Sequence, residues 1–243
     1  MPTASAAPSP PPPLPEPIEV RTPSRDGIWL RGTLYPAPEP DAPLVLLVHQ
    51  LGSSRKEWEE VIRELRKAPP LAVLAIDLRG HGESTESEGQ ERISFLNFTQ
   101  KDWERLEIDV TTMVHYLRGP ASPVRPRKIF LVGSSIGATA VIRTAAADPS
   151  LEVLALLSPG RAYHGVDVMV PASKLGPRRL LAIASRHESD SAETASVLAK
   201  LTQGKALVVD EEGHGVSLLS ANSSHLRTLV DFLRENQREA EKR

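Results

Sequence analysis

Short apolar runs alternate along the chain with longer segments whose apolar residues recur every three or four positions. The run Leu44-Val-Leu-Leu-Val48 is apolar throughout, as is typical of a strand buried on both faces of a parallel sheet. In residues 102–118, by contrast, Trp103, Leu106 and Val110 fall on one face of a helix. The pattern predicts strands over residues 18–22, 28–35, 44–48, 71–76, 128–132, 151–157, 179–184 and 205–209, and helices over 55–67, 102–118, 136–147, 191–201 and 224–235. Because neighbouring parallel strands need helical crossovers, this alternation predicts an α/β fold.

Composition narrows the class of protein further. Of the 243 residues, 40% are hydrophobic and 25% are charged, and the formal net charge is −2. Such a chain is typical of a soluble globular protein, and α/β folds of this length often form one domain. The balanced charge gives no sign of a nucleic acid or anionic membrane as partner. No apolar run approaches the roughly 18 residues that a membrane-spanning helix needs. The lack of cysteine excludes disulfides, thiolate catalysis and cysteine-ligated metals.

The prolines are concentrated at the N-terminus, where eight of the 22 fall within the first 17 residues. We therefore expect residues 1–17 to form a disordered tail or linker, residues 18–236 the folded domain, and residues 237–243 a charged tail. The first segment has neither the basic nor the apolar region of a signal peptide. It is either a native tail or a tether left after removal of an export signal. The default expectation is therefore a cytoplasmic protein, with an exported or envelope-tethered one as the alternative.

A candidate nucleophile follows the strand at 128–132. The strand runs directly into Gly133-Ser134-Ser135-Ile136-Gly137 and then into an alanine-rich helix, which is the strand–turn–helix setting of a Gly-x-Ser-x-Gly nucleophile elbow. The sharp turn leaves no room for bulk two residues to either side of the nucleophile. Glycines flank Ser135 at those positions, whereas Val132 and Ile136 flank Ser134, so the pattern selects Ser135.

A serine nucleophile needs a histidine base. We expect this base to be His214, which lies between two glycines in the loop after the strand at 205–209. His115 and His225 fall in predicted helices and are expected to be structural or exposed, and the sequence does not place His164.

The histidine in turn needs an acid, which in the chain order serine–acid–histidine should follow a strand between them. Glu188 and Asp190 both follow the strand at 179–184. Glu188 is favoured because Asp190 is placed to cap the next helix. Asp210 is a weaker third candidate.

Two backbone N–H groups are expected to form an oxyanion hole. One is that of Ile136, directly after the nucleophile, and the other that of Leu51 in the loop after the third strand. The alternative for this loop is a plain strand-to-helix connection with Ser54 as the helix cap.

With these motifs in place, residues 18–236 resemble the α/β-hydrolase superfamily. Asp77-Leu-Arg-Gly-His-Gly-Glu-Ser84 matches the family's Asp-x-Arg-Gly-His-Gly-x-Ser loop, in which His81 is structural. His49-Gln-Leu-Gly52 resembles the oxyanion loop His-Gly-x-Gly, with glutamine replacing a glycine. Ser185-Arg-His-Glu188 is similar to the family's acid turn and places the acid at Glu188. The resemblance implies a mostly parallel sheet of about eight strands and no cofactor, and lies closest to capless bacterial serine esterases and dienelactone-hydrolase-like proteins.

These residues together predict a serine carboxylesterase that forms an acyl-enzyme on Ser135. Hydrolysis of a lactone, thioester or amide is the nearest alternative, and a non-catalytic binding protein is the second. No metal is expected, since no histidine–carboxylate cluster has ligand spacing. Residues 158–178 are too few and too broken for a helical cap, which predicts an open site for short- to medium-chain esters. The side chains expected to line its pocket are Gln50, Tyr163, Val166 and Met169. The expected partner is a small ester, and the expected state is a monomer or small homo-oligomer.

Overall fold

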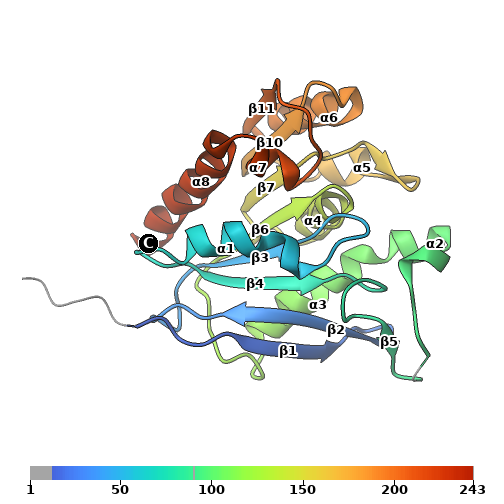
Figure 1. Ribbon diagram of the computed structural model, residues 1–243, viewed down its shortest axis with the longest axis vertical. Helices are drawn as coiled ribbons and strands as arrows, with labels where there is room; N and C mark the ends of the chain where they lie inside the picture. Colours follow the sequence, from blue (N-terminus) through green and yellow to red (C-terminus); the bar gives the residue numbers. More distant parts are fainter. Residues whose placement is uncertain (1–12, 90, 243) are drawn as a thin grey trace, which may run out of the picture.

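The computed structural model describes residues 13–89 and 91–242, and a single twisted sheet dominates it (Figure 1). The strand order is β1-β2-β4-β3-β6-β7-β10-β11, and the short β5 pairs with β2. β2 is antiparallel to β1, β4 and β5, and all other neighbours in the sheet are parallel. The strands are β1 (Ile18–Pro23), β2 (Ile28–Tyr35), β3 (Leu44–Val48), β4 (Ala72–Asp77), β5 (Glu86–Ser87), β6 (Ile129–Ser134), β7 (Val153–Leu157), β10 (Arg179–Ser185) and β11 (Lys205–Val209). The predicted fold class is confirmed.

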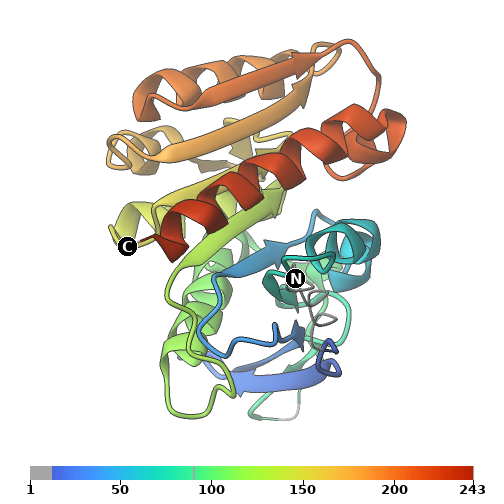
Figure 2. The same ribbon diagram turned by 90° about the vertical axis from the view of Figure 1, so that its left-hand side faces the viewer.

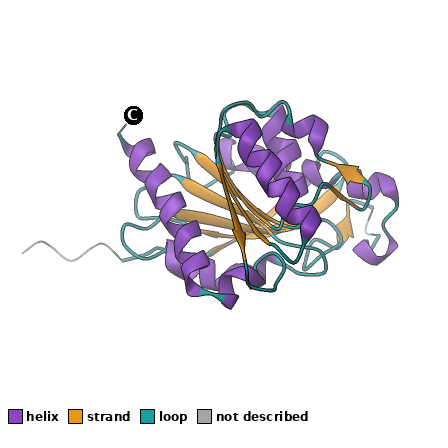
Figure 3. Ribbon diagram, turned by 90° about the horizontal axis from the view of Figure 1, so that it is seen from above, coloured by secondary structure: helices purple, strands orange, loops and turns teal. Residues whose placement is uncertain are grey.

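Helices cover both faces of the sheet, so the molecule has three layers (Figure 3). One face is covered by α1 (Glu59–Leu65), α7 (Ser217–Ala221) and α8 (Ser223–Glu241), the last of which crosses the front of Figure 2. The other is covered by α3 (Leu106–Arg118), α4 (Ile136–Ala147) and α6 (Ser189–Thr202). The remaining elements are the 3-10 turns η1 (Arg55–Trp58) and η2 (Phe95–Asn97), the short helices α2 (Gln100–Glu104) and α5 (Met169–Ala172), and a hairpin of β8 (Ala162–Tyr163) and β9 (Val166–Asp167).

The apolar run in β3 shows why the pattern predicts a central strand. All five residues are fully buried, and alternate ones join the two cores on opposite faces of the sheet. Leu44, Leu46 and Val48 pack under α3 and α4, whereas Val45 and Leu47 pack under α1 and α8. A strand buried on both faces has no polar position, which accounts for the unbroken run.

Three helices differ from the prediction. The one expected over 55–67 begins as the 3-10 turn η1 and ends at Leu65. The helix expected over 102–118 is divided at Arg105 into α2 and α3, and α2 begins with a capping box between Thr99 and Asp102. The final helix continues to Glu241, through residues that were expected to form a charged tail. Its last turns are held because the Gln237 side chain is buried and Arg179 forms ion pairs with Glu235 and Glu239.

The N-terminal prediction lies mostly outside the described residues, because it covers residues 1–17. Within the described part, Pro15 contacts the folded domain through its carbonyl oxygen, which accepts a hydrogen bond from Arg66 Nη2 at 3.0 Å. The segment Leu14–Pro17 has no regular secondary structure.

Buried charges hold the loop after β4 in place. Arg79 forms ion pairs of 2.7 Å with Asp26 and with Asp109, whose side chain is fully buried. In the same loop Gly82 has a φ of +50°, and a Cβ there would lie 2.3 Å from the Asp77 carboxylate. The Asp77–Ser84 motif is therefore explained by packing and charge pairing beside the site.

Candidate active site

Ser135 occupies a strained turn between β6 and α4. Its φ of +53° and ψ of −117° lie outside the ordinary regions for a residue with a side chain, and it is 5% exposed. A Cβ on Gly137 would lie 2.4 Å from the Val48 carbonyl oxygen, and one on Gly133 would lie 2.6 Å from the Gly137 carbonyl oxygen. Both glycines are therefore required for α4 to approach β3 and β6, and the residue between them is Ser135.

Glu188 and His214 meet at the carboxyl ends of the neighbouring strands β10 and β11. Glu188 Oε1 lies 2.6 Å from His214 Nδ1. The other two candidate acids contact different residues: Asp190 accepts a hydrogen bond from the Arg161 backbone N–H at 3.0 Å, and Asp210 forms an ion pair with Arg186. Asp190 also lies within the first turn of α6, whose N-cap position is occupied by Glu188, so the expectation that Asp190 is the N-cap was wrong.

The loop that carries His214 packs directly against the serine elbow. Gly215 has a φ of +60°, and a Cβ on it would lie 2.1 Å from Gln50 Oε1 and 2.2 Å from Ser134 Oγ. The structure thus brings the serine elbow, the loop after β3 and the histidine loop together. Among the described residues no direct hydrogen bond joins Ser135 Oγ to His214, an arrangement that is common before a substrate binds.

Each of the two expected oxyanion donors directly follows a residue of this junction, Leu51 after Gln50 and Ile136 after Ser135. Ile136 is the first residue of α4, where a backbone N–H has no acceptor within the helix. Leu51 is 37% exposed and follows Gln50, whose own N–H donates to Glu57 Oε1 at 3.0 Å. Burial raises the pKa of Glu57 to about 7. The alternative expectation for this loop, a strand-to-helix connection capped by Ser54, is also confirmed in part, because the Ser54 side chain caps the 3-10 turn η1.

The four expected pocket residues have different surroundings. Gln50 accepts a hydrogen bond from Ser134 Oγ at 3.1 Å, and the Tyr163 ring stands edge-on to the His214 ring with 6.1 Å between centroids. Val166 is 3% exposed and belongs to the hydrophobic core. The structure therefore brings Gln50 and Tyr163, but not Val166, to the candidate triad.

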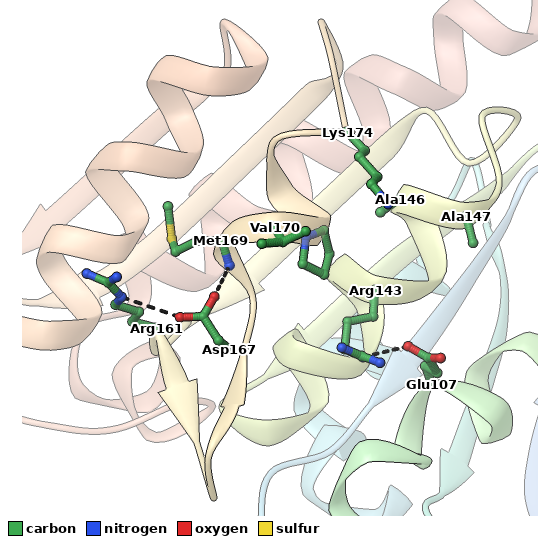
Figure 4. A pocket seen from close by; sticks show the side chains of 10 residues that line it. Glu107, Arg143, Ala146, Ala147, Arg161, Asp167, Met169, Val170 and Lys174 are labelled. Carbon is green, nitrogen blue, oxygen red and sulfur yellow. Dashed lines mark hydrogen bonds and ion pairs between the residues drawn. The ribbon is translucent and has the colours of Figure 1, made fainter.

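Met169 lines a separate cavity of about 640 Å³ between α4 and α5 (Figure 4). The other residues that line this cavity are Glu107, Arg143, Ala146, Ala147, Arg161, Asp167, Val170, Pro171 and Lys174. None of the candidate triad residues is among them, so this cavity is separate from the triad.

The other histidines contact different groups. His81 is buried and stacked on Phe95, and burial lowers its pKa. His225 is buried with its Nδ1 against the Leu218 carbonyl, and the His164 ring stacks on Trp103 with 3.9 Å between centroids. His115 is exposed on α3. His49 Nε2 accepts from the Leu78 N–H, and His187 Nε2 lies 3.0 Å from the Asp210 carbonyl oxygen. His214 differs from these histidines because it contacts an acid and belongs to a loop that packs against the elbow.

Sequence reasoning missed Ser158 and Glu57. Ser158 directly follows β7, is fully buried, and contacts both Glu188 and the histidine loop. Its position at the carboxyl end of a central strand is a signal that could have found it. Glu57 lies in η1 and has no comparable signal, because only the tertiary contact with Gln50 distinguishes it from the neighbouring surface glutamates.

A mostly parallel eight-stranded path with a strained serine elbow between β6 and α4 defines the α/β-hydrolase fold. The sequence model of the alpha/beta hydrolase family matches residues 45–235, and the chain therefore belongs to this family. The expected resemblance is confirmed at the level of the family.

Similar proteins include both curated relatives and solved structures. A stretch of 119 residues is 30% identical to protein phosphatase methylesterase 1 of Mus musculus and covers 48% of this chain but 28% of that protein. An esterase of Pyrococcus furiosus has a TM-score of 0.73 at 17% identity, over 90% of each chain. A dienelactone hydrolase of Anabaena variabilis has a TM-score of 0.67 at 18% identity, over 90% of this chain and 98% of that one. At these identities the two structures show a shared fold.

No helix among the described residues is both long enough and apolar enough to cross a membrane.

Proposed function

We propose that the protein is a serine carboxylesterase in which Ser135 is the nucleophile, His214 the base and Glu188 the acid that orients it. The observation that carries this proposal is the 2.6 Å contact between Glu188 and His214, in a loop that packs against the elbow of Ser135. A carboxylate on Nδ1 leaves Nε2 free to accept a proton. The esterase relatives and structural neighbours support this reaction class.

In the proposed reaction each of these groups has one role. Ser135 Oγ attacks the ester carbonyl carbon while its proton passes to His214 Nε2, and the N–H groups of Leu51 and Ile136 stabilise the oxyanion. The alcohol leaves with the proton from His214, which yields an acyl-enzyme. Water then attacks the acyl carbon with His214 as base, which releases the acid and restores Ser135.

The substrate class we propose is an ester of short to medium acyl chain. Between β7 and β10 the chain forms only the β8–β9 hairpin and the four-residue α5, so no helical cap is built there. Large lids are what provide lipases with an apolar surface for lipid interfaces. The same triad would also cleave a lactone, thioester or amide, and a non-catalytic protein of this fold is the remaining alternative.

A fluorophosphonate probe separates these possibilities. The wild-type protein should be labelled on Ser135, as read by mass spectrometry, and should hydrolyse p-nitrophenyl butyrate. Ser135→Ala should lose both properties, and His214→Ala should lose hydrolysis by several orders of magnitude. Ser134→Ala is the matched control and should keep much of the activity, because Ser134 Oγ contacts Gln50 rather than the reacting atoms.

The outcomes identify the function. Labelling of Ser135 without turnover of any ester in a broad panel would favour another acyl bond as the substrate. An unlabelled wild-type protein would contradict the proposal and favour a binding protein.

A further inference from the structure

Ser158 lies where the triad acid and the histidine loop come together. It is the first residue after β7, its side chain is fully buried, and its backbone N–H donates to the Ile183 carbonyl in β10 at 2.8 Å. Ser158 is thus held against β10, the strand that precedes Glu188. The residue before it is joined to the serine elbow, because the N–H of Ser135 donates to the Leu157 carbonyl oxygen at 2.8 Å.

The Ser158 hydroxyl makes two hydrogen bonds, one as a donor and one as an acceptor. It donates to Glu188 Oε2 at 3.0 Å and accepts from the Gly215 N–H at 2.9 Å. The other carboxylate oxygen of Glu188 contacts His214, and Gly215 is the residue that follows His214. One hydroxyl therefore sets the rotation of the acid and the position of the loop that carries the base.

The backbone at Ser158 indicates that the hydroxyl has a specific role. The φ of Ser158 is +45°, in the left-handed region that favours glycine and that costs free energy for a residue with a side chain. Glycine would fit this backbone without strain but would leave Glu188 Oε2 and the Gly215 N–H without this partner. The Ser158 carbonyl oxygen also accepts from the Tyr163 hydroxyl at 3.0 Å, so the same residue fixes the aromatic ring beside His214.

We propose that Ser158 is a positioning residue that acts through Glu188 and the Gly215 backbone to aim His214 at Ser135. This inference rests on the proposed function for its effect on turnover. The contacts of Ser158 with the Glu188–His214 pair can be tested separately, whether or not the protein hydrolyses esters.

The variant Ser158→Gly separates the hydroxyl from the fold. It removes both hydrogen bonds and relieves the backbone strain, so the melting temperature should change by only a few degrees. The value of kcat for p-nitrophenyl butyrate should fall by about 10- to 100-fold, a range typical for groups that orient a reacting residue, while KM stays within about threefold. Ser158→Ala is the matched variant: it also lacks the hydroxyl but keeps the strain, and it should lose the same activity at a lower melting temperature.

A double-mutant cycle tests whether Ser158 acts through the acid. In a Glu188→Gln background, Ser158→Gly should cost less than about threefold in kcat, because the carboxylate that it orients is already gone. Losses that multiply across the two sites would overturn the proposal, as would full kcat in Ser158→Gly.

Proton NMR provides a readout that does not need turnover. The hydrogen-bonded Nδ1–H of His214 should give a low-field resonance that His214→Ala removes, and Ser158→Gly should shift or broaden it. If the wild-type protein neither reacts with fluorophosphonate nor cleaves esters, the proposed function fails while this resonance still tests the positioning role. A low-field resonance that is unchanged in Ser158→Gly would overturn the proposal for Ser158.

Discussion

Ser134 Oγ donates a hydrogen bond of 3.1 Å to Gln50 Oε1, which joins the serine elbow to the loop after β3. Gln50 therefore contacts the residue directly before the candidate nucleophile. Gly215 of the histidine loop packs against both partners of this bond. The three loops of the candidate site therefore depend on one another for their positions.

This packing predicts that a methyl group on Gly215 would break the hydrogen bond between Ser134 and Gln50. A Cβ there would lie within 2.2 Å of Gln50 Oε1 and Ser134 Oγ, which are ends of side chains that can rotate, so Gly215→Ala should turn both side chains and lower kcat/KM by about 10-fold. The matched control is Gly176→Ala, which has a similar φ of +61° but no atom within 4 Å of the added methyl group. The control should lose only about 1 kcal/mol of stability from backbone strain and keep its activity. Equal activities of the two variants in an ester assay would contradict this account.

The choice of acid predicts different effects for two neighbouring carboxylates. Glu188→Gln should lower kcat by about 10³- to 10⁴-fold, because the amide neither stabilises the imidazolium nor fixes its tautomer. Asp190→Asn should change kcat by less than about threefold, since an amide oxygen can still accept from the Arg161 N–H. Steady-state kinetics on both folded variants would decide. A larger loss in the Asp190 variant would require the assignment to be reversed.

The raised pKa of the Glu57 carboxyl predicts that the free energy of unfolding depends on pH. Its pKa is raised by burial from 4.5 to about 7, so between these values the folded state binds more protons than the unfolded state. The contribution of this group to stability is therefore full below pH 4.5 and is lost as the pH rises through about 7. Glu57→Gln is always neutral and should gain stability relative to the wild type as the pH rises from 5 to 8. The gain should exceed about 1 kcal/mol, since one pKa unit corresponds to about 1.4 kcal/mol.

Denaturant unfolding at the two pH values measures this difference. Glu60→Gln provides the control, because Glu60 is an exposed residue of the neighbouring α1. A stability difference between wild type and Glu57→Gln that does not change with pH would contradict the prediction.

The absence of a helical cap between β7 and β10 predicts the response to acyl-chain length. Among p-nitrophenyl esters from acetate to palmitate, kcat/KM should be highest for the short and medium chains. The rate should not jump when the substrate exceeds its solubility limit, because the β8–β9 hairpin and α5 provide no lid that could open at an interface. A preference for palmitate, or activation by an emulsion, would refute this expectation.

The sequence by itself determined which segments form strands and which of these strands are buried. A strand buried on both faces is apolar at every position, as β3 is, so the central strands could be predicted from apolar runs. The strands β1 and β2, at one end of the sheet, are not such runs, and they were predicted from the turn at Asp26-Gly27 and from the spaced apolar residues beside it. The serine elbow could also be predicted from the sequence, because only glycine fits the close backbone contacts two residues before and after Ser135. Local rules failed at the last helix, which continues to Glu241 because Gln237 is buried and because Glu235 and Glu239 form ion pairs with Arg179 on a distant strand.

Only the tertiary structure decided which carboxylate contacts His214. Glu188 and Asp190 are two residues apart and chemically similar, and the sequence could only favour one of them. The parallel register of β10 and β11 pairs Ser185 with Val209, so the loops that follow these two strands leave the sheet side by side. Glu188 faces His214 there, whereas Asp190 has already entered α6. Ser158 became visible for the same reason: its hydroxyl bonds to residues 30 and 57 positions away, and such contacts depend on how the strands are ordered in the sheet.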